Sequence, residues 1–173
     1  KKILNEIALE VDPRNGMNEE KLLEYKNFGV NRLSFGVQDF NTDVQKAVNR
    51  INSYELLDGL LTNKVRKAFE SINFDFIFGL PKQTEASIKE TREKILKLNP
   101  SRITLLGMDH RPDVYKHQNA YDEKDLPNVY TKVKMYFESV EFLELNGFKR
   151  IGVNHFAKGD DILAKYKDMK KIY

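Results

Sequence analysis

The stretch "RLSFGVQDF", Arg32 to Phe40, alternates between buried-type and small or polar residues and then places a glutamine and an aspartate side by side. A period of two is typical of a β-strand. The strand is thus followed by an amide and a carboxylate side chain instead of the residues of an ordinary turn. If other strands end in the same way, the repetition indicates a functional edge of a sheet.

Four further segments also have the composition of strands. With residues 31–38, the predicted strands are 6–11, 72–80, 101–109 and 148–155. Helical periodicity separates most of them. Strand and helix in alternation predict an α/β fold with a parallel sheet, because parallel neighbours need a crossover and a helix is the usual one.

The first two predicted helices are defined by caps and apolar faces. Asn18 can cap a helix that carries Leu22, Leu23 and Phe28 inward and ends at Gly29. Asn52 and Glu55 are spaced as a capping pair for the second helix. Its inward face is expected to consist of Leu57, Leu60, Leu61, Val65 and Ala68.

Two later helices show similar signals. Thr84 can start a helix that ends before Pro100. Pro127 suits the first turn of the next helix, and Gly147 suits its end. The inward stripe of that helix is expected to be Val129, Val133, Tyr136, Phe137, Val140 and Leu143. The final segment, from Lys158 onward, is typical of a charged helix, and residues 111–126 form a charged loop expected to be mobile or to face a substrate.

Every predicted strand has polar side chains at or near its end. They are Glu10 and Asp12, Gln38 and Asp39, Asp75, Asp109 and His110, and Asn154 and His155. In parallel α/β folds the chemistry gathers at the carboxyl edge of the sheet. Phe74 and Phe76 flank Asp75, so its carboxylate needs a partner or a ligand. Alternatively, each polar residue only caps a helix or makes a turn.

Composition excludes several classes of protein. The 173 residues suit one domain, and no apolar run is long enough to span a bilayer. A net charge of +3, from 29 basic and 26 acidic residues, gives no indication of nucleic-acid binding. The absence of cysteine excludes thiolate metal sites and is compatible with a cytoplasmic location. No P-loop, GxGxxG or GxSxG motif occurs, so nucleoside triphosphate, dinucleotide and serine-hydrolase functions lack support. With no cysteine and no HExxH spacing, we expect no self-contained metal site.

Six blocks of sequence together resemble a known family. They are "LEVDPR", "NRLSFGVQDFN", "VNR", "DFIFGLPKQT", "LNPSRIT" and "GFKRIGVNHFAKGDD", and they run in order through nearly the whole chain. This set is similar to the oxygen-independent coproporphyrinogen III oxidase, or dehydrogenase, family of the radical S-adenosylmethionine superfamily. A single block such as "GLPKQT" would be a weak signal.

The resemblance implies a fold and a reaction. Members of the family have an incomplete (β/α)6 barrel, similar to a TIM barrel, and convert coproporphyrinogen III to protoporphyrinogen IX by oxidative decarboxylation of two propionates in haem biosynthesis. A [4Fe-4S] cluster held by three cysteines cleaves S-adenosylmethionine to a 5'-deoxyadenosyl radical. The implied partners are coproporphyrinogen III and an electron donor, with no nucleic acid and no membrane.

The resemblance also implies cofactor contacts, which carry over onto Glu10, Gln38, Arg50, Asp75 and, less securely, Asp109. The chemistry of S-adenosylmethionine suits the first four. Its ribose diol needs carboxylate or amide partners, its cationic groups favour Glu10 or Asp75, and its carboxylate suits the guanidinium of Arg50. Alternatively, Arg50 forms a surface ion pair and Gln38 caps a helix. No residue is predicted to be catalytic.

The chain departs from the family pattern in several places. The cysteine motif and the glycine-rich strand-end motif are missing, so residues 1–173 are expected to be the central and later part of the barrel domain, truncated at both ends. Such a segment alone should be inactive. Asp109 stands where the family has a small residue, and Asn154 replaces an aspartate beside His155. These two substitutions leave the contacts of Asp109, His110, Asn154 and His155 undecided.

Two other functions fit the same sequence. The first is that of the related haem chaperone of the superfamily, which binds haem and has no oxidase activity; Asp12, Arg14 and the block Gln38 to Phe40 favour the dehydrogenase. The second is an α/β module that serves only as an interaction scaffold. Stoichiometric binding of haem by the full-length protein without turnover of coproporphyrinogen would support the first. Unaltered S-adenosylmethionine affinity of the cluster-loaded parent after alanine substitution of Arg50 or Asp75 would argue against a pocket and support the second.

Overall fold

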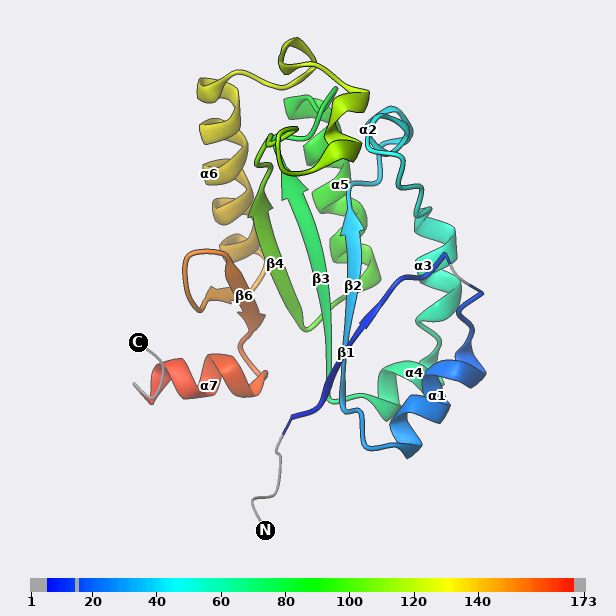
Figure 1. Cartoon of the computed structure of the whole chain (residues 1–173). Helices are drawn as coiled ribbons and strands as arrows, with labels where there is room; N and C mark the ends of the chain where they lie inside the picture. Colours follow the sequence, from blue (N-terminus) through cyan, green and yellow to red (C-terminus); the bar gives the residue numbers. More distant parts are fainter. Residues whose placement is uncertain (1–5, 15, 170–173) are drawn as a thin grey trace.

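The chain folds into one curved sheet with helices around one of its faces (Figure 1). The structure is a computed structural model that describes residues 6–14 and 16–169. Within these residues the six-stranded sheet has the order β1-β2-β3-β4-β6-β5. The strands are β1 Ala8–Val11, β2 Arg32–Gln38, β3 Ser71–Phe78, β4 Arg102–Gly107, β5 Phe148–Arg150 and β6 His155–Lys158.

The first four strands confirm the predicted parallel α/β sheet. β1, β2, β3 and β4 pair in parallel in chain order. The helices are α1 Glu19–Asn27, α2 Thr42–Ala47, α3 Tyr54–Leu60, α4 Asn63–Ala68, α5 Glu85–Leu98, α6 Val129–Leu145 and α7 Ile162–Asp168. A helical crossover therefore separates each pair of consecutive parallel strands, as the alternating periodicity predicted.

The predicted fifth strand, 148–155, is wrong as a single parallel strand. β5 and β6 instead form an antiparallel pair, and β6 runs antiparallel to β4. The residues between them, 151–154, make the turn, so Asn154 and His155 do not end a parallel strand. Gly152 within this turn has open space around it, which suits a tight reversal of the chain.

The core lies between the sheet and the helices. Phe35, Phe74 and Phe76 are fully buried, and Phe35 packs edge-on against Phe74 with ring centroids 6.1 Å apart. Because side chains alternate along a strand, the residues between these phenylalanines face the other side of the sheet. That concave face carries the polar residues Ser34, Asn73, Asp75 and Thr104.

Helix ends agree with the sequence in three places and differ at the predicted second helix. The side chains of Asn18 and Thr84 accept hydrogen bonds from the backbone of the first turns of α1 and α5, and Gly147 follows α6 with a φ of 84°. The predicted second helix is instead two helices, α3 and α4, capped by Ser53 and Thr62.

Some apolar residues predicted to face inward are exposed. Phe28 is 82% exposed, and along α6 Val129, Val133 and Phe137 are also exposed, whereas Met135 and Leu143 are buried. Pro127 lies before the cap Asn128 rather than in the first turn of α6. The predicted stripe is therefore confirmed at Val140 and Leu143 and wrong at Val129, Val133 and Phe137.

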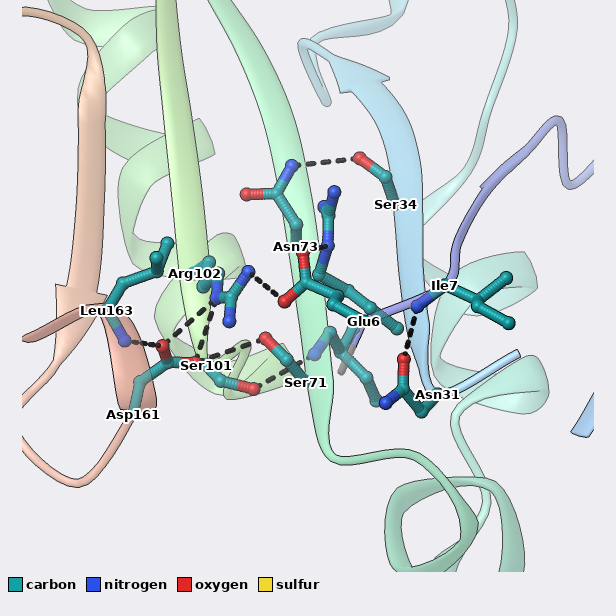
Figure 2. A network of polar contacts seen from close by, with 12 residues as sticks. Glu6, Ile7, Asn31, Ser34, Ser71, Asn73, Ser101, Arg102, Asp161 and Leu163 are labelled. Carbon is teal, nitrogen blue, oxygen red and sulfur yellow. Dashed lines mark hydrogen bonds and ion pairs between the residues drawn. The ribbon is translucent and has the colours of Figure 1, made fainter. Parts of the chain in front are cut away.

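The amino end of the sheet is held by ion pairs (Figure 2). Arg102 on β4 is buried and contacts Asp161 at 2.9 Å and Glu6 at 3.0 Å. Ser71 on β3 donates to Asp161, which also caps α7 through the backbone of Leu163. Buried ion pairing at the amino end of the sheet, away from the carboxyl edge where the chemistry gathers, indicates a structural role. No helix in the described part of the chain could cross a membrane.

Candidate functional site

The four predicted cofactor contacts line one hollow. Glu10 is the penultimate residue of β1, Gln38 ends β2, Arg50 follows α2, and Asp75 lies on β3. Together with Asp12, Ser34 and Gly36 they enclose about 310 Å³ on the concave face. The hollow thus combines three carboxylates with one guanidinium, and it lies towards the carboxyl ends of the strands. We call it the acidic hollow.

Asp75 is satisfied by neighbours on the concave face. Ser34 Oγ donates to its Oδ2 at 3.1 Å, and Asn73 Nδ2 donates to its Oδ1 at 2.8 Å. Its carboxylate is half-buried and points away from the helices, because Phe74 and Phe76 occupy the alternate positions. The apolar surroundings expected from the sequence are therefore on the opposite face of the sheet.

The end of β2 explains why an amide and a carboxylate follow the strand. Gln38 has a φ of 63°, and the Asp39 N–H donates to the Val37 carbonyl at 2.8 Å, which makes a γ-turn centred on Gln38. The pairing with β3 shifts by one residue at the same point, between Gly36 and Gln38. This turn directs Gln38 into the acidic hollow while Asp39 is fully buried.

Asp39 joins β2 to α5 and is not part of the hollow. Its carboxylate accepts from Thr91 Oγ1 at 2.8 Å, Gln83 Nε2 at 2.6 Å and the Asn41 backbone at 2.6 Å. Burial raises the pKa of this carboxyl above its ordinary value, against the opposing effect of these donors. The sequence grouped Asp39 with the polar strand ends, but here it has the structural role that we kept as the alternative.

Arg50 lies over Gly36. A Cβ atom on Gly36 would be 2.5 Å from Arg50 Nη2, so only glycine leaves room for the guanidinium. The Arg50 Nε is buried, and no described residue accepts a hydrogen bond from it. Asn52, predicted to cap a helix, instead donates from Nδ2 to the Gly36 carbonyl at 2.8 Å. The guanidinium therefore lines the hollow, and its buried Nε is left without a partner among the described residues.

Asp12 and Arg14 form a local ion pair beside the hollow. Arg14 donates to both carboxylate oxygens of Asp12, from Nη2 at 2.6 Å and from Nε at 2.9 Å. The hydrogen bond from the Arg14 side chain is the main cause that lowers the pKa of Asp12 to about 2. Asp12 thus stays ionised and contributes negative charge to the acidic hollow.

The undecided residues at the other strand ends lie outside the acidic hollow. His155 is beside Thr104, with 3.5 Å between His155 Nδ1 and Thr104 Oγ1. His110 stacks on Tyr121 with ring centroids 5.3 Å apart, and its buried Nε2 has no partner among the described residues. Asp109 is exposed, and its carbonyl accepts from Gln118.

The loop over the carboxyl edge has internal structure. It contains two short 3-10 helices, Lys116–Ala120 and Glu123–Asp125. Gln118 is buried and bridges the Arg111 N–H and the Asp109 carbonyl, and the Lys82 N–H donates to the Asp125 carbonyl. These contacts hold the loop against the ends of β3 and β4. Its predicted position towards a ligand stays a prediction.

Metal binding can be assessed from the side chains. No group of three or more His, Asp or Glu side chains suited to a metal ion occurs in residues 6–14 and 16–169. The chain contains no cysteine, so its residues do not fit a thiolate-held iron-sulfur cluster. They do fit S-adenosylmethionine, because the acidic hollow offers carboxylates for cationic groups and the Arg50 guanidinium for an anionic one.

Comparisons with known proteins agree on one superfamily. The sequence model of the radical SAM superfamily matches residues 1–95. The oxygen-independent coproporphyrinogen III oxidase of Escherichia coli (strain K12) is 40% identical over 159 residues, which are 92% of this chain and 35% of that protein. The Helicobacter pylori (strain ATCC 700392 / 26695) enzyme of the same name is 39% identical over 158 residues, which are 91% of this chain and 34% of that protein.

Solved structures give the same picture. The structure described as coproporphyrinogen III oxidase from Escherichia coli, a radical SAM enzyme, superposes with a TM-score of 0.90 and 40% identity, over 95% of this chain and 38% of that one. The sheet and helices therefore match part of its TIM-like barrel. The archaeal Elp3 protein of Methanocaldococcus infernus, at 13% identity and a TM-score of 0.57 over 97% of this chain and 42% of that one, shares the fold alone. The chain spans about a third of the length of the curated relatives it matches.

Proposed function

The chain belongs to the radical S-adenosylmethionine superfamily, and from this membership we propose that it forms the cofactor-holding part of an oxygen-independent coproporphyrinogen III oxidase. Residues 1–173 would be the central and later part of the barrel domain. The observation that carries the proposal is the gathering of Glu10, Gln38, Arg50 and Asp75 in one hollow. The 40% identity to relatives of that name supports the choice of reaction.

Each side chain of the acidic hollow has a role in the proposal. The carboxylates of Glu10 and Asp75 attract the sulfonium and ammonium groups and accept from ribose hydroxyls, with Gln38 as an amide partner. Arg50 binds the cofactor carboxylate through its guanidinium. Ser34 and Asn73 hold the Asp75 carboxylate in place, because both donate to it.

The reaction follows from the cofactor and not from an acid or base of this chain. When bound, S-adenosylmethionine would supply hydrogen abstraction for the oxidative decarboxylation of two propionates of coproporphyrinogen III, with a [4Fe-4S] cluster whose ligands are not among these residues. The residues described above bind and orient the cofactor. A reaction of this kind also needs an electron donor, and the absence of cysteine is compatible with a cytoplasmic location.

Calorimetric titration with S-adenosylmethionine tests the proposed site. Asp75→Asn should weaken binding roughly 10- to 100-fold, since a charge-assisted contact contributes about 1.5–3 kcal/mol. Asp58→Asn is the matched control, because Asp58 is exposed on α3 and changes the charge equally. Equal affinities of the two variants, each measured in a polypeptide that contains this chain and holds the cluster, would contradict the proposal.

A haem titration separates the reaction from the related binding function. Turnover of coproporphyrinogen III under anaerobic conditions by a polypeptide that contains this chain and holds the cluster supports the oxidase. Stable one-to-one binding of haem without that turnover would instead support the haem chaperone.

A further inference from the structure

A row of polar side chains crosses the concave face of the sheet. It consists of Ser34 on β2, Asn73 and Asp75 on β3, Thr104 on β4 and His155 on β6. In the register of the sheet Asn73 lies opposite Ser34, and Thr104 lies opposite both Asp75 and His155. Residues paired in register point to the same face, so their side chains are neighbours. We call these five residues the concave row.

Short contacts connect the row from end to end. Asn73 Nδ2 lies 2.9 Å from Ser34 Oγ and 2.8 Å from Asp75 Oδ1, and Figure 2 shows the first of these contacts. Thr104 Oγ1 lies 3.3 Å from Asn73 Oδ1. His155 Nδ1 lies 3.5 Å from Thr104 Oγ1, which is the longest contact of the row. The row therefore joins the exposed His155 to the carboxylate of Asp75 in the acidic hollow.

The Asp75 carboxylate fixes the position of each proton in the row. An ionised carboxylate only accepts hydrogen bonds, so the amide atom of Asn73 that faces Asp75 is the nitrogen. The other amide atom is then the oxygen, which also only accepts, so Thr104 donates its single hydroxyl proton to it. Thr104 has only a lone pair left for His155, so Nδ1 of His155 carries a proton. The hydrogen bonds thus run in one direction, from His155 towards Asp75.

Thr104 is the donor that fixes the orientation of the Asn73 amide. A flipped amide would turn its oxygen towards the Asp75 carboxylate, and two acceptors repel each other. In the observed orientation the amide oxygen faces the Thr104 hydroxyl. Asn73 is only 5% exposed and Thr104 only 8%, and buried polar groups need a partner. Loss of the hydroxyl would therefore leave the amide oxygen without its donor and allow the amide to turn.

We propose that Thr104 is a positioning residue for Asp75 and acts through Asn73. Thr104 itself does not line the acidic hollow. The amide that it orients donates to one oxygen of Asp75 and to the Ser34 hydroxyl, which donates to the other oxygen. One buried amide thus aligns both oxygens of the carboxylate. The inference rests on the proposed function, in which Asp75 contacts S-adenosylmethionine.

Replacement of the Thr104 hydroxyl by a methyl group tests the proposal. In a polypeptide that contains this chain and holds the cluster, Thr104→Val should weaken S-adenosylmethionine binding about three- to tenfold, equivalent to about 0.7–1.4 kcal/mol. Thr104→Ser keeps the hydroxyl and should bind as tightly as the unmodified protein. Thr62→Val is the matched control, because Thr62 Oγ1 also donates to a side-chain oxygen, Glu19 Oε2, outside the acidic hollow. It loses the cap of α4 and hence stability, and it should keep its affinity.

Coupling to Asp75 distinguishes a positioning role from a general loss of stability. In Asp75→Asn the carboxylate that Thr104 aligns is absent, so Thr104→Val should have little further effect on S-adenosylmethionine affinity in that background. A substitution that only destabilises the fold would have the same effect in both backgrounds.

Two NMR measurements on the same polypeptide need no S-adenosylmethionine. The Asn73 Nδ2 protons should exchange with water faster in Thr104→Val than in Thr104→Ser, because the amide is held less firmly in the valine variant. At alkaline pH, the ring-nitrogen chemical shifts of neutral His155 should show the proton on Nδ1. Both measurements test the concave row independently of the proposed function.

Any of four results would overturn the inference. They are equal affinities of Thr104→Val and Thr104→Ser, a full-sized effect of Thr104→Val in Asp75→Asn, equal exchange of the Asn73 protons in the two Thr104 variants, and a neutral His155 with its proton on Nε2. In the last case Thr104 would donate to His155 and not to Asn73. Unchanged affinity in Asp75→Asn would instead contradict the proposed cofactor site, and the NMR measurements would still decide whether Thr104 orients Asn73.

Discussion

Gly36→Ala should separate ligand affinity from fold stability. The new methyl group would lie 2.5 Å from Arg50 Nη2, 3.2 Å from Arg50 Cζ and 3.0 Å from Gln38 Nε2. Ordinary contact begins near 3.4 Å, so the guanidinium has to withdraw by about 1 Å. The backbone itself accepts alanine, because Gly36 is not among the residues with positive φ.

The two effects have opposite signs. Displacing Arg50 should remove a charge-assisted contact of about 1.5–3 kcal/mol, which lowers S-adenosylmethionine affinity roughly 10- to 100-fold. Replacing a strand glycine by alanine should add about 0.5–1 kcal/mol to the free energy of unfolding. Gly59→Ala in α3 provides the control, since a Cβ there meets nothing within 4 Å. It should gain stability and keep its affinity.

Calorimetry and urea unfolding measure the two quantities in the same samples. Arg50→Ala combined with Gly36→Ala then shows whether glycine acts through the guanidinium. The glycine substitution should have little further effect on affinity once Arg50 is gone. A full-sized additional loss in the double variant, or unchanged affinity in Gly36→Ala alone, would refute the positioning role of Gly36.

Three other predictions concern the carboxylates. Asp39→Asn should lower the free energy of unfolding at neutral pH by about 1–3 kcal/mol, because the new amide faces a glutamine amide donor; urea titration measures it. Burial raises the pKa of Asp39 in the folded protein, so the contribution of its carboxyl to the free energy of unfolding is fully present below about pH 3.8 and decreases as pH rises through the folded pKa. Urea titrations across pH should show this dependence in the unmodified protein and not in Asp39→Asn. The pKa of Asp12 is lowered to about 2, so the modest, solvent-screened contribution of its carboxylate to the free energy of unfolding is present above about pH 3.8 and lost as pH falls towards 2. An NMR pH titration of the Asp12 carboxyl measures this change. Arg102→Gln should cost about 3–5 kcal/mol in the same unfolding assay, because Asp161 stays buried without its ion-pair partner.

The sequence predicted the sheet where local periodicity and topology agree. β1 to β4 were found because their residues alternate or form short apolar runs, and because Thr84 and Gly147 mark helix ends. The hairpin of β5 and β6 was missed, since a continuous run from 148 to 155 has no strong turn residue except Gly152. Pairing direction depends on tertiary contacts that periodicity does not encode.

The placement of the site residues was predictable in part. Functional residues of a parallel sheet gather at its carboxyl edge, and this rule was enough to predict that Glu10, Gln38 and Asp75 lie together. Arg50 was predicted only from the family resemblance. The role of Gly36 was missed, although a glycine inside a strand is itself a signal of close approach by another group. The Asp39 cluster was also missed, because its partners Gln83 and Thr91 are more than 40 residues away.

The γ-turn at Gln38 lowers the stability of the fold, and the same turn places the Gln38 side chain in the acidic hollow. A non-glycine residue held at a φ of 63° costs of order 1 kcal/mol, and glycine would adopt the same geometry without that strain. Selection for heat tolerance alone would therefore favour glycine at position 38. The amide side chain at position 38 is therefore explained by function and not by thermal stability. Screens for more stable variants should leave Gln38 unchanged.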